Sequence, residues 1–434
     1  MQQFMEQLQQ MFAAPGGGPV NWELADQIAR AHLTGAQVAP PPLGFALPGT
    51  PGVGVVGQPV VPGTGSQDQP EPPVGDPAVT PTERIAVAES LRLADLWLEA
   101  ESALPSGISA VAAWSRGEWL THTLGVWRKL CDPVAERMVA AMTELVPDEA
   151  RAQLGAITSM VTSLGGALFG GQLGTALGSL AAEVLSAGDI GLPLGPAGTA
   201  ALVPANILAY GEGLEIPEDQ VRLYVALREA AHQRLFGHVP WLRGHVFTAV
   251  QAYASGIHVD RDAVEQAISR IDPSTFGSDP TEISLEGIFT PEDTPQQQAA
   301  LARLETVLAL VEGWVCHVVD RAAAQRLPDI ARLSEAFRRR RATGGPAEQT
   351  FAALVGLELR PRRLREAAAL WAALAEHRGI SGRDSLWGHP DLMPDAEAFA
   401  DPETFAKTEL DLGDLGFSAS GGSDAPGPDL PEST

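Results

Sequence analysis

The chain has 434 residues, enough for one large domain or two ordinary ones with tails, and 45% of them are hydrophobic, which suffices for a packed core. Its formal net charge of −25 argues against general affinity for nucleic acid or anionic lipid, because both require a basic surface. The two cysteines, Cys131 and Cys316, are far apart and lack metal-ligand spacing, which predicts a reducing compartment without disulfides. Residues 1–12 lack the basic start and apolar stretch of a secretory signal, so we expect a cytoplasmic protein.

Composition divides the chain into four segments. Residues 1–36 contain a predicted amphipathic helix, Asn21–Leu33, whose apolar stripe needs a partner, so we expect it to dock on the main domain. Residues 37–79 are rich in Pro and Gly and predict a disordered linker. Residues 80–407 form the main domain, and the acidic tail at 408–434 is expected to be disordered.

The main domain is predicted to be mainly helical. It opens at Thr80-Pro81-Thr82-Glu83, a capping-box pattern with proline at the first helical position. Helical patterns continue to Ala103, and then from Ser109 to Leu145 with a break near Asp132-Pro133. Further helices are expected at Asp260–Ile271, Pro295–Arg326, Ile330–Arg341, Ala347–Leu357 and Pro361–Arg378.

The segment Ala152–Ala182 carries no charged residue and is long enough to span a bilayer. It has glycine at every fourth position from Gly166 to Gly178, a spacing that also lets membrane helices approach closely. Its many Ser, Thr and Gln residues and its shortage of large aliphatic side chains favour a buried, tightly packed helix pair instead. We therefore expect no membrane span.

A minor β element is predicted just before the helix that begins at Pro217. The stretch Leu192–Ile216 is extended and rich in turns, and Ala201–Tyr210 has the composition of short strands, although Pro204 limits any strand there to an edge.

The helix from Pro217 to about Gly237 contains the sequence Arg228-Glu229-Ala230-Ala231-His232. A zinc hydrolase helix typically has His-Glu-x-x-His, in which two histidines one turn apart hold zinc and the glutamate activates water. Here Arg228 stands at the first ligand position, and a guanidinium has no lone pair to give to a metal. The apolar stripe places Arg228 and His232 on the inward face, so an alternative is that Arg228 pairs with a buried acid and is purely structural.

The wider sequence resembles the zincin-like metallopeptidase family, whose members are described as hydrolases and which has a sister branch associated with deazaflavin-coenzyme biosynthesis. The resemblance covers nearly the whole chain outside the linker and the tail. It rests on Arg-Glu-x-x-His followed by His238-Val-Pro-Trp-Leu-Arg, on Val311-Glu-Gly-Trp-Val-Cys-His-Val-Val-Asp320, on Phe337–Arg341 with Gly344-Gly-Pro346, on Leu386-Trp387 through Asp401-Pro402, and on Gly17-Gly-Pro-Val-Asn-Trp22.

This resemblance implies a zincin-like helical fold and gives roles to particular residues. The family's catalytic glutamate corresponds to Glu229, and one zinc-binding histidine corresponds to His232. The family's first zinc-binding histidine falls on Arg228, where this sequence departs from the motif. We therefore expect zinc to be bound weakly or not at all.

A further metal ligand has to come from outside this helix. Glu312 is the favoured residue, because it lies on a second long predicted helix and Gly313 beside it allows close approach. His317 on the same helix is an alternative, and so is His238, six residues after His232.

Two functions follow from this motif. The first is a zinc-dependent peptidase or hydrolase that acts on a peptide or protein. The second is a catalytically inactive zincin fold that serves as a binding or scaffold protein, with an Arg228–Glu312 ion pair where the metal would be. No Gly-x-Gly-x-x-Gly or Gly-Lys-Ser/Thr loop predicts a nucleotide cofactor.

Overall fold

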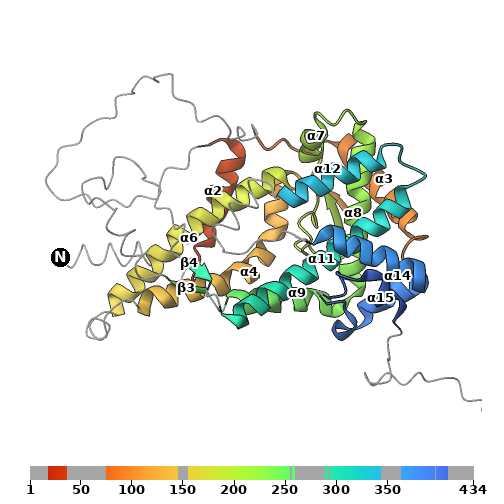
Figure 1. The fold of residues 1–434 in the computed structure, drawn as a ribbon. Coiled ribbons are helices and arrows are strands. Elements are labelled where there is room, and N and C mark those ends of the chain that lie inside the picture. The colour runs from red at the N-terminus through yellow and green to blue at the C-terminus, as the bar shows by residue number, and fades with distance from the viewer. Residues whose placement is uncertain are drawn as a thin grey trace, which may run out of the picture.

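A computed structural model describes residues 18–36, 75–144, 155–254, 257–259, 289–291, 294–343, 363–395 and 397–408. The predicted helices at 260–271 and 347–357, most of the predicted linker and nearly all of the tail lie outside these ranges. Within the described residues the protein is mainly α-helical, as the sequence predicts, with only short strands (Figure 1).

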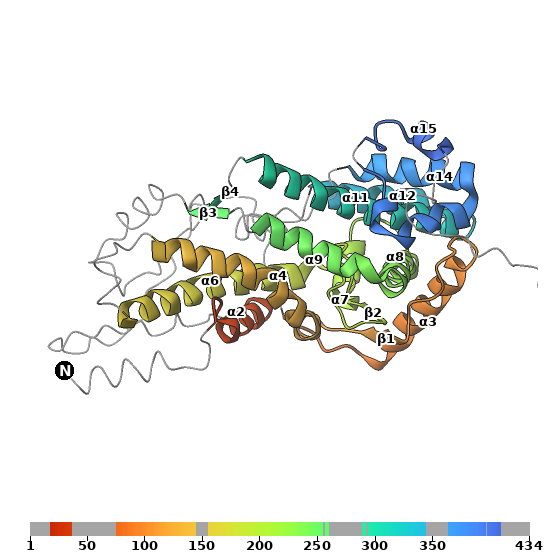
Figure 2. The same ribbon diagram turned by 90° about the horizontal axis from the view of Figure 1, so that it is seen from below.

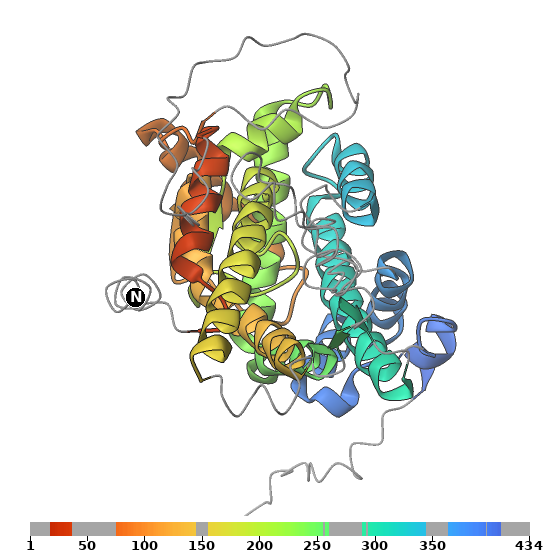
Figure 3. The ribbon, with the colours of Figure 1, turned by 90° about the vertical axis from the view of Figure 1, so that its left-hand side faces the viewer.

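The helices form three neighbouring groups (Figures 2 and 3). In the first, α2 (Trp22–Thr34) and α4 (Arg116–Glu144) both pack on α6 (Gly155–Glu183). In the second, α8 (Glu218–His238) is followed by α9 (Pro240–Ala254) and contacts α3 (Pro81–Leu98) and α7 (Pro204–Gly211). In the third, α11 (Pro295–Ala323) packs on α14 (Leu364–Asp384), which contacts α15 (Pro402–Lys407). The helix α12 (Ile330–Thr343) and two 3₁₀ turns, Ser385–Gly388 and Pro390–Leu392, complete the body.

The N-terminal helix packs along α6. Asn21 caps α2 by accepting a hydrogen bond from the Leu24 amide at 3.0 Å. Several glycines of α6 face this helix, and a Cβ atom added to any of three of them would lie within 2.6–2.9 Å of a backbone oxygen of α2 or of its cap residue Asn21. These contacts join Gly170 to Asn21, Gly174 to Ala25 and Gly178 to Ala29. The missing side chains therefore let α2 and α6 approach each other backbone to backbone.

The predicted helix pair at Ala152–Ala182 is wrong, because residues 155–183 form one continuous helix. Glycine disfavours a helix by about 1 kcal/mol per residue, but here close packing against α2 makes up for the loss. Over the described ranges, no helix has both the length and the apolar character needed to cross a membrane.

Two other boundaries differ from the expectation. The stretch after Ser109 begins with a strand, β1 (Ala110–Ala113), and α4 starts only at Arg116. That helix then runs through Pro133 without a break, because its packing against α2, α6 and α9 compensates for the hydrogen bond that proline removes. The end of the predicted linker reaches this region, since the Asp76 carboxylate accepts hydrogen bonds from the Arg116 and Gly117 amides at 2.9 and 3.0 Å.

The predicted β element before α8 is present as β2 (Thr199–Leu202), but most of the predicted stretch Ala201–Tyr210 is helical, because α7 occupies it. It pairs in parallel with β1, with Ala110 opposite Thr199 and Ala113 opposite Leu202. Pro204 does not lie on an edge strand but starts α7, where its missing N–H is not needed. A second pair, β3 (Ile257–Val259) and β4 (Phe289–Pro291), is antiparallel.

Acidic residues in the first turn stabilise the starts of two core helices. Thr80 and Glu83 form the reciprocal capping box at the start of α3. At the start of α8, Glu218 and Asp219 place negative charge at the positive end of the helix dipole. The helix is then buried on all sides from Tyr224 to Leu235, so every polar side chain in that stretch needs a partner within the protein.

Candidate functional site

The polar residues of α8 meet Glu312 of α11 in the middle of the core. Arg228, His232 and Glu312 are each no more than 2% exposed. The Arg228 Nη2 atom lies 2.5 Å from Glu312 Oε2, and His232 Nε2 lies 2.9 Å from Glu312 Oε1. Arg228 and His232 lie one turn apart on α8, and each contacts a different oxygen of the Glu312 carboxylate.

Further contacts hold the Arg228 guanidinium in this position. Its Nη1 atom donates to the Cys316 Sγ atom at 3.4 Å, and its Cζ atom lies 3.9 Å from the centre of the Phe337 ring. A cation over an aromatic face in a dry environment contributes roughly 2 kcal/mol. The guanidinium is thus surrounded by groups that favour its charged form.

Glu229 points to a different set of partners. Its Oε2 atom accepts the Gly188 amide proton at 2.8 Å, and its Oε1 atom accepts from the Gln233 side chain at 2.9 Å. Glu229 is fully buried. The residue that resembles a catalytic base therefore has both oxygens occupied by protein donors.

Burial and pairing shift the pKa values of these carboxyl groups in opposite directions. Burial would raise the pKa of Glu312, but Arg228, Arg341 and His232 together hold it well below its ordinary value. Burial also raises the pKa of Glu229, and here the nearby His232 and its hydrogen bonds offset the effect only in part. Burial would lower the pKa of Arg228, yet the Glu312 carboxylate raises it well above its ordinary value. Arg228 and Glu312 are therefore a charged pair.

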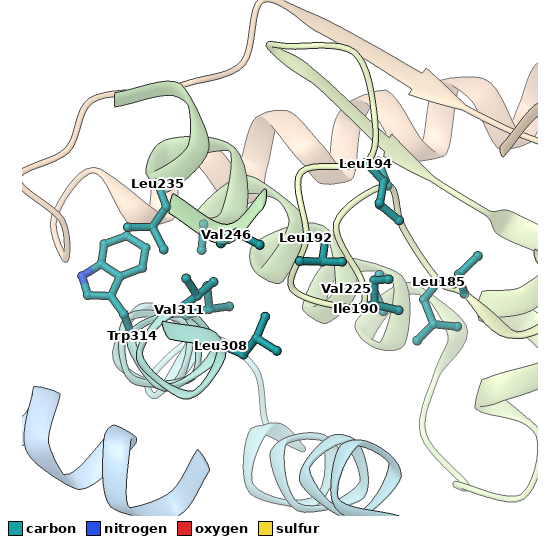
Figure 4. Close-up of a cluster of buried hydrophobic side chains, with 14 of the residues drawn as sticks. Leu185, Ile190, Leu192, Leu194, Val225, Leu235, Val246, Leu308, Val311 and Trp314 are labelled. Carbon is teal, nitrogen blue, oxygen red and sulfur yellow. The ribbon is translucent and has the colours of Figure 1, made fainter. Parts of the chain in front are cut away.

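The loop between α6 and β2 covers this cluster. Leu185, Ile190 and Leu192 are buried, and Figure 4 shows them with Val225 of α8 and Leu308 of α11 in one group of apolar side chains. The loop passes very close to Glu229 and Glu312. A Cβ atom added at either of two loop glycines would contact one of these carboxylates. These are Gly188, at 3.1 Å from Glu229 Oε2, and Gly191, at 2.9 Å from Glu312 Oε1.

Asp189 fixes the same loop to α12. Its carboxylate accepts hydrogen bonds from Arg340 at 3.0 Å and from the Leu185 amide at 3.0 Å. The Arg341 guanidinium donates to the Ile190 carbonyl oxygen at 3.1 Å. Burial would raise the pKa of Asp189, but Arg340 and Arg341 outweigh it and lower that pKa. The cover loop is therefore held by charged contacts to α12 and by apolar packing against α8 and α11 (Figure 4).

The two histidines that the sequence offers as alternative metal ligands, His238 and His317, lie away from this cluster. His238 is at the end of α8, where its Nε2 atom is 3.0 Å from the Ser106 carbonyl oxygen. His317 is on α11, and its charged neighbours are Arg383, Arg321 and Asp384. Burial and these two arginines lower the pKa of His317 to about 4, so it is neutral at pH 7. The structure thus brings Arg228, Glu229, His232 and Glu312 together, and leaves both of these histidines apart.

The groups that complete the site were not predictable from the sequence. The cover loop follows a long helix and has no motif of its own, although Gly188 and Gly191 mark close approach of backbone to side chain. Gly313 does permit a close helix contact, but with Ala367 of α14 rather than with α8.

The zinc that a zincin fold implies does not fit this set of residues. Because an ionised carboxylate can only accept, His232 Nε2 donates its proton to Glu312, and the lone pair there is absent. Arg228 occupies the remaining oxygen of Glu312 with a fixed positive charge. His232 Nδ1 is buried and has no hydrogen-bond partner. It is therefore the only ring nitrogen of His232 with a lone pair available to a metal. The described residues contain no group of three or more His, Cys, Asp or Glu able to hold a metal ion.

Comparison with known proteins is informative at the level of family and fold. A family model described as zincin-like metallopeptidase matches residues 64–406. No curated protein matches the chain. A crystal structure from Chloroflexus aurantiacus, described as that of a "putative hydrolase with a novel fold", is similar over 89% of this chain and 97% of its own, with a TM-score of 0.56 and 20% sequence identity. That structural likeness shows a shared fold. The family model matches most of the chain, and it shows that the chain belongs to the zincin-like metallopeptidase family.

Proposed function

We propose that this protein is a zincin-like fold in which an arginine has replaced the metal, and that it acts as a binding or scaffold protein rather than as a zinc hydrolase. The observation that carries the proposal is the contact between Arg228 and Glu312, with His232 on the second oxygen of the same carboxylate. A guanidinium supplies there a fixed positive charge that a zinc ion would otherwise supply.

The position of Glu229 supports the same conclusion. A general base has to reach a water molecule or a substrate proton at hydrogen-bond distance. In this protein Glu229 is fully buried beneath the cover loop, and the Gly188 amide and the Gln233 side chain take its two oxygens. These contacts favour a structural role, in which Glu229 ties the loop to α8.

The proposal is tested by restoring the missing histidine. Arg228→His removes the guanidinium, frees one oxygen of Glu312 and recreates His-Glu-x-x-His on α8. We expect isothermal titration calorimetry to detect zinc binding to Arg228→His and not to the wild type. Arg228→Gln, which removes the charge without adding a ligand, is the matched control and should stay without zinc.

Peptide hydrolysis gives the second readout. The wild type and Glu229→Gln should show the same background rate on a mixed peptide library with zinc added, because Glu229 has no catalytic part in the proposal. A rate in the wild type that zinc supports and that Glu229→Gln abolishes would favour the zinc peptidase instead.

A further inference from the structure

A pocket of about 430 Å³ lies beside the buried cluster. Its walls are the loop Ser106–Ser109 before β1, the cover-loop residues Ala187, Gly188 and Leu192–Gly198 before β2, and residues from the end of α8 and the start of α9. Among the latter are Phe236, His238 and Arg243. Its size falls within the range of small-molecule sites, which is about 300–1,000 Å³.

The pocket wall is built by close backbone contact. A Cβ atom at Gly107 would lie 1.9 Å from the Gln233 carbonyl oxygen, and one at Gly237 would lie 3.1 Å from the Gly107 Cα atom. His238 Nε2 donates to the Ser106 carbonyl oxygen at 3.0 Å and fixes the same loop to the end of α8. These contacts set the distance between the loop and α8, so the pocket is a preformed feature of the fold.

The charge of the pocket is opposite to that of the protein. The chain has a formal net charge of −25, yet none of the described residues that line the pocket is Asp or Glu. Arg243 is half-buried there and forms no ion pair with any residue that the structure describes. Burial lowers the pKa of Arg243, with no carboxylate to offset it. Within the described ranges, Arg243 therefore lacks the paired carboxylate that a buried positive charge normally has.

The position of Arg243 on its helix adds to this imbalance. It lies in the first turn of α9, which begins at Pro240. The start of a helix carries a partial positive charge, so a cation is unfavourable there and an anion is favourable. A bound anion would therefore gain from both the guanidinium and the helix end, and would relieve their mutual repulsion.

We propose that this pocket binds a small monocarboxylate with an apolar body. The carboxylate pairs with the Arg243 guanidinium, whose planar fork matches two carboxylate oxygens. The body packs on the apolar side chains of Ile108, Leu194 and Phe236, which share the pocket. A singly charged group suits a site with one cation, whereas a phosphate dianion would need further positive charge.

This inference names a ligand class for the proposed binding function, but it does not depend on the zinc argument. None of Arg228, Glu229, His232 or Glu312 lines the pocket. Calorimetry with zinc tests the buried cluster, and calorimetry with a carboxylate tests the pocket, so failure of one is distinguishable from failure of the other.

The test uses N-acetyl-leucine and N-acetyl-leucinamide, which differ in the charge of one group. We expect the wild type to bind the acid roughly tenfold or more tightly than the amide, because a hydrogen bond to a charged group contributes about 1.5–3 kcal/mol. Arg243→Gln should lose that preference and bind the acid as weakly as the amide. The matched control is Arg321→Gln, which removes the same charge from an exposed position on α11.

Any of three results with the wild type or with Arg243→Gln would overturn the proposal. They are equal affinity of the wild type for acid and amide, no binding of the acid, and unchanged acid binding in Arg243→Gln. Because the comparison of acid with amide is made on the wild type, it remains decisive even if the variant folds poorly. Loss of acid binding in Arg321→Gln to the same degree would also count against it, since net charge alone would then explain the effect.

Discussion

Removing one member of the Arg228–Glu312 pair should destabilise the protein strongly. Both side chains are almost fully buried, and each charge is neutralised chiefly by the other. Breaking a buried pair by removing one partner typically costs about 3–5 kcal/mol, because the remaining charge stays uncompensated. We therefore expect Arg228→Met and Glu312→Leu each to lower the free energy of unfolding by about that amount.

The double variant should cost much less than the sum of the two single variants. Once both charges are replaced by apolar side chains of similar size, the main remaining loss is the hydrogen bond between His232 and Glu312. An unpaired buried polar group costs about 1–3 kcal/mol, so the double variant should be destabilised by roughly that amount. Urea unfolding followed by circular dichroism on all four proteins gives the coupling energy. Single variants that each lose less than about 1 kcal/mol, or effects that simply add, would refute the reasoning.

Three further outcomes are expected from the same structure. Gly107→Ala should destabilise by roughly 1–3 kcal/mol in urea unfolding, because its Cβ would lie 1.9 Å from a backbone oxygen of α8, while Gly125→Ala, with nothing within 4 Å, should be neutral or stabilising. Gly170→Leu should overpack the contact of α6 with α2 by a similar roughly 1–3 kcal/mol, seen as a lower Tm; an unchanged Tm would contradict that contact. The pKa of Asp189 is lowered by Arg340, so the stability this pair provides is present above the ordinary pKa of 3.8 and is lost as pH falls below it. Asp189→Asn should therefore be less stable than the wild type at neutral pH, with a gap that narrows in acid; a gap that does not change with pH would exclude this pairing.

Local features of the fold were predictable from the sequence. Thr80 and Glu83 lie three residues apart and cap the same helix end, so their pattern is visible without any tertiary information. The inward direction of Arg228 followed from the apolar stripe of α8, and so did its need for a buried acidic partner, which the structure supplies as Glu312. These predictions needed only helical periodicity and the rule that a buried charge requires a partner.

Contacts between distant parts of the chain were not predictable in the same way. The strand β1 is paired with β2, which lies about ninety residues further on, and a four-residue strand has too short a pattern to be recognised. The continuity of α6 depends on α2, whose backbone fits against the glycines. The cover loop and the Arg243 pocket arise where several loops meet α8, so no single stretch of sequence contains them.

The central claim is that Arg228 stands in place of a zinc ion, and the metal content of the native protein tests it most directly. The protein should be purified without an affinity tag and without chelator, and its zinc measured by inductively coupled plasma mass spectrometry. We predict zinc far below one equivalent per chain, because Arg228 and His232 already occupy both oxygens of Glu312. One tightly bound zinc per chain, lost in His232→Ala, would contradict the account and restore the zinc peptidase.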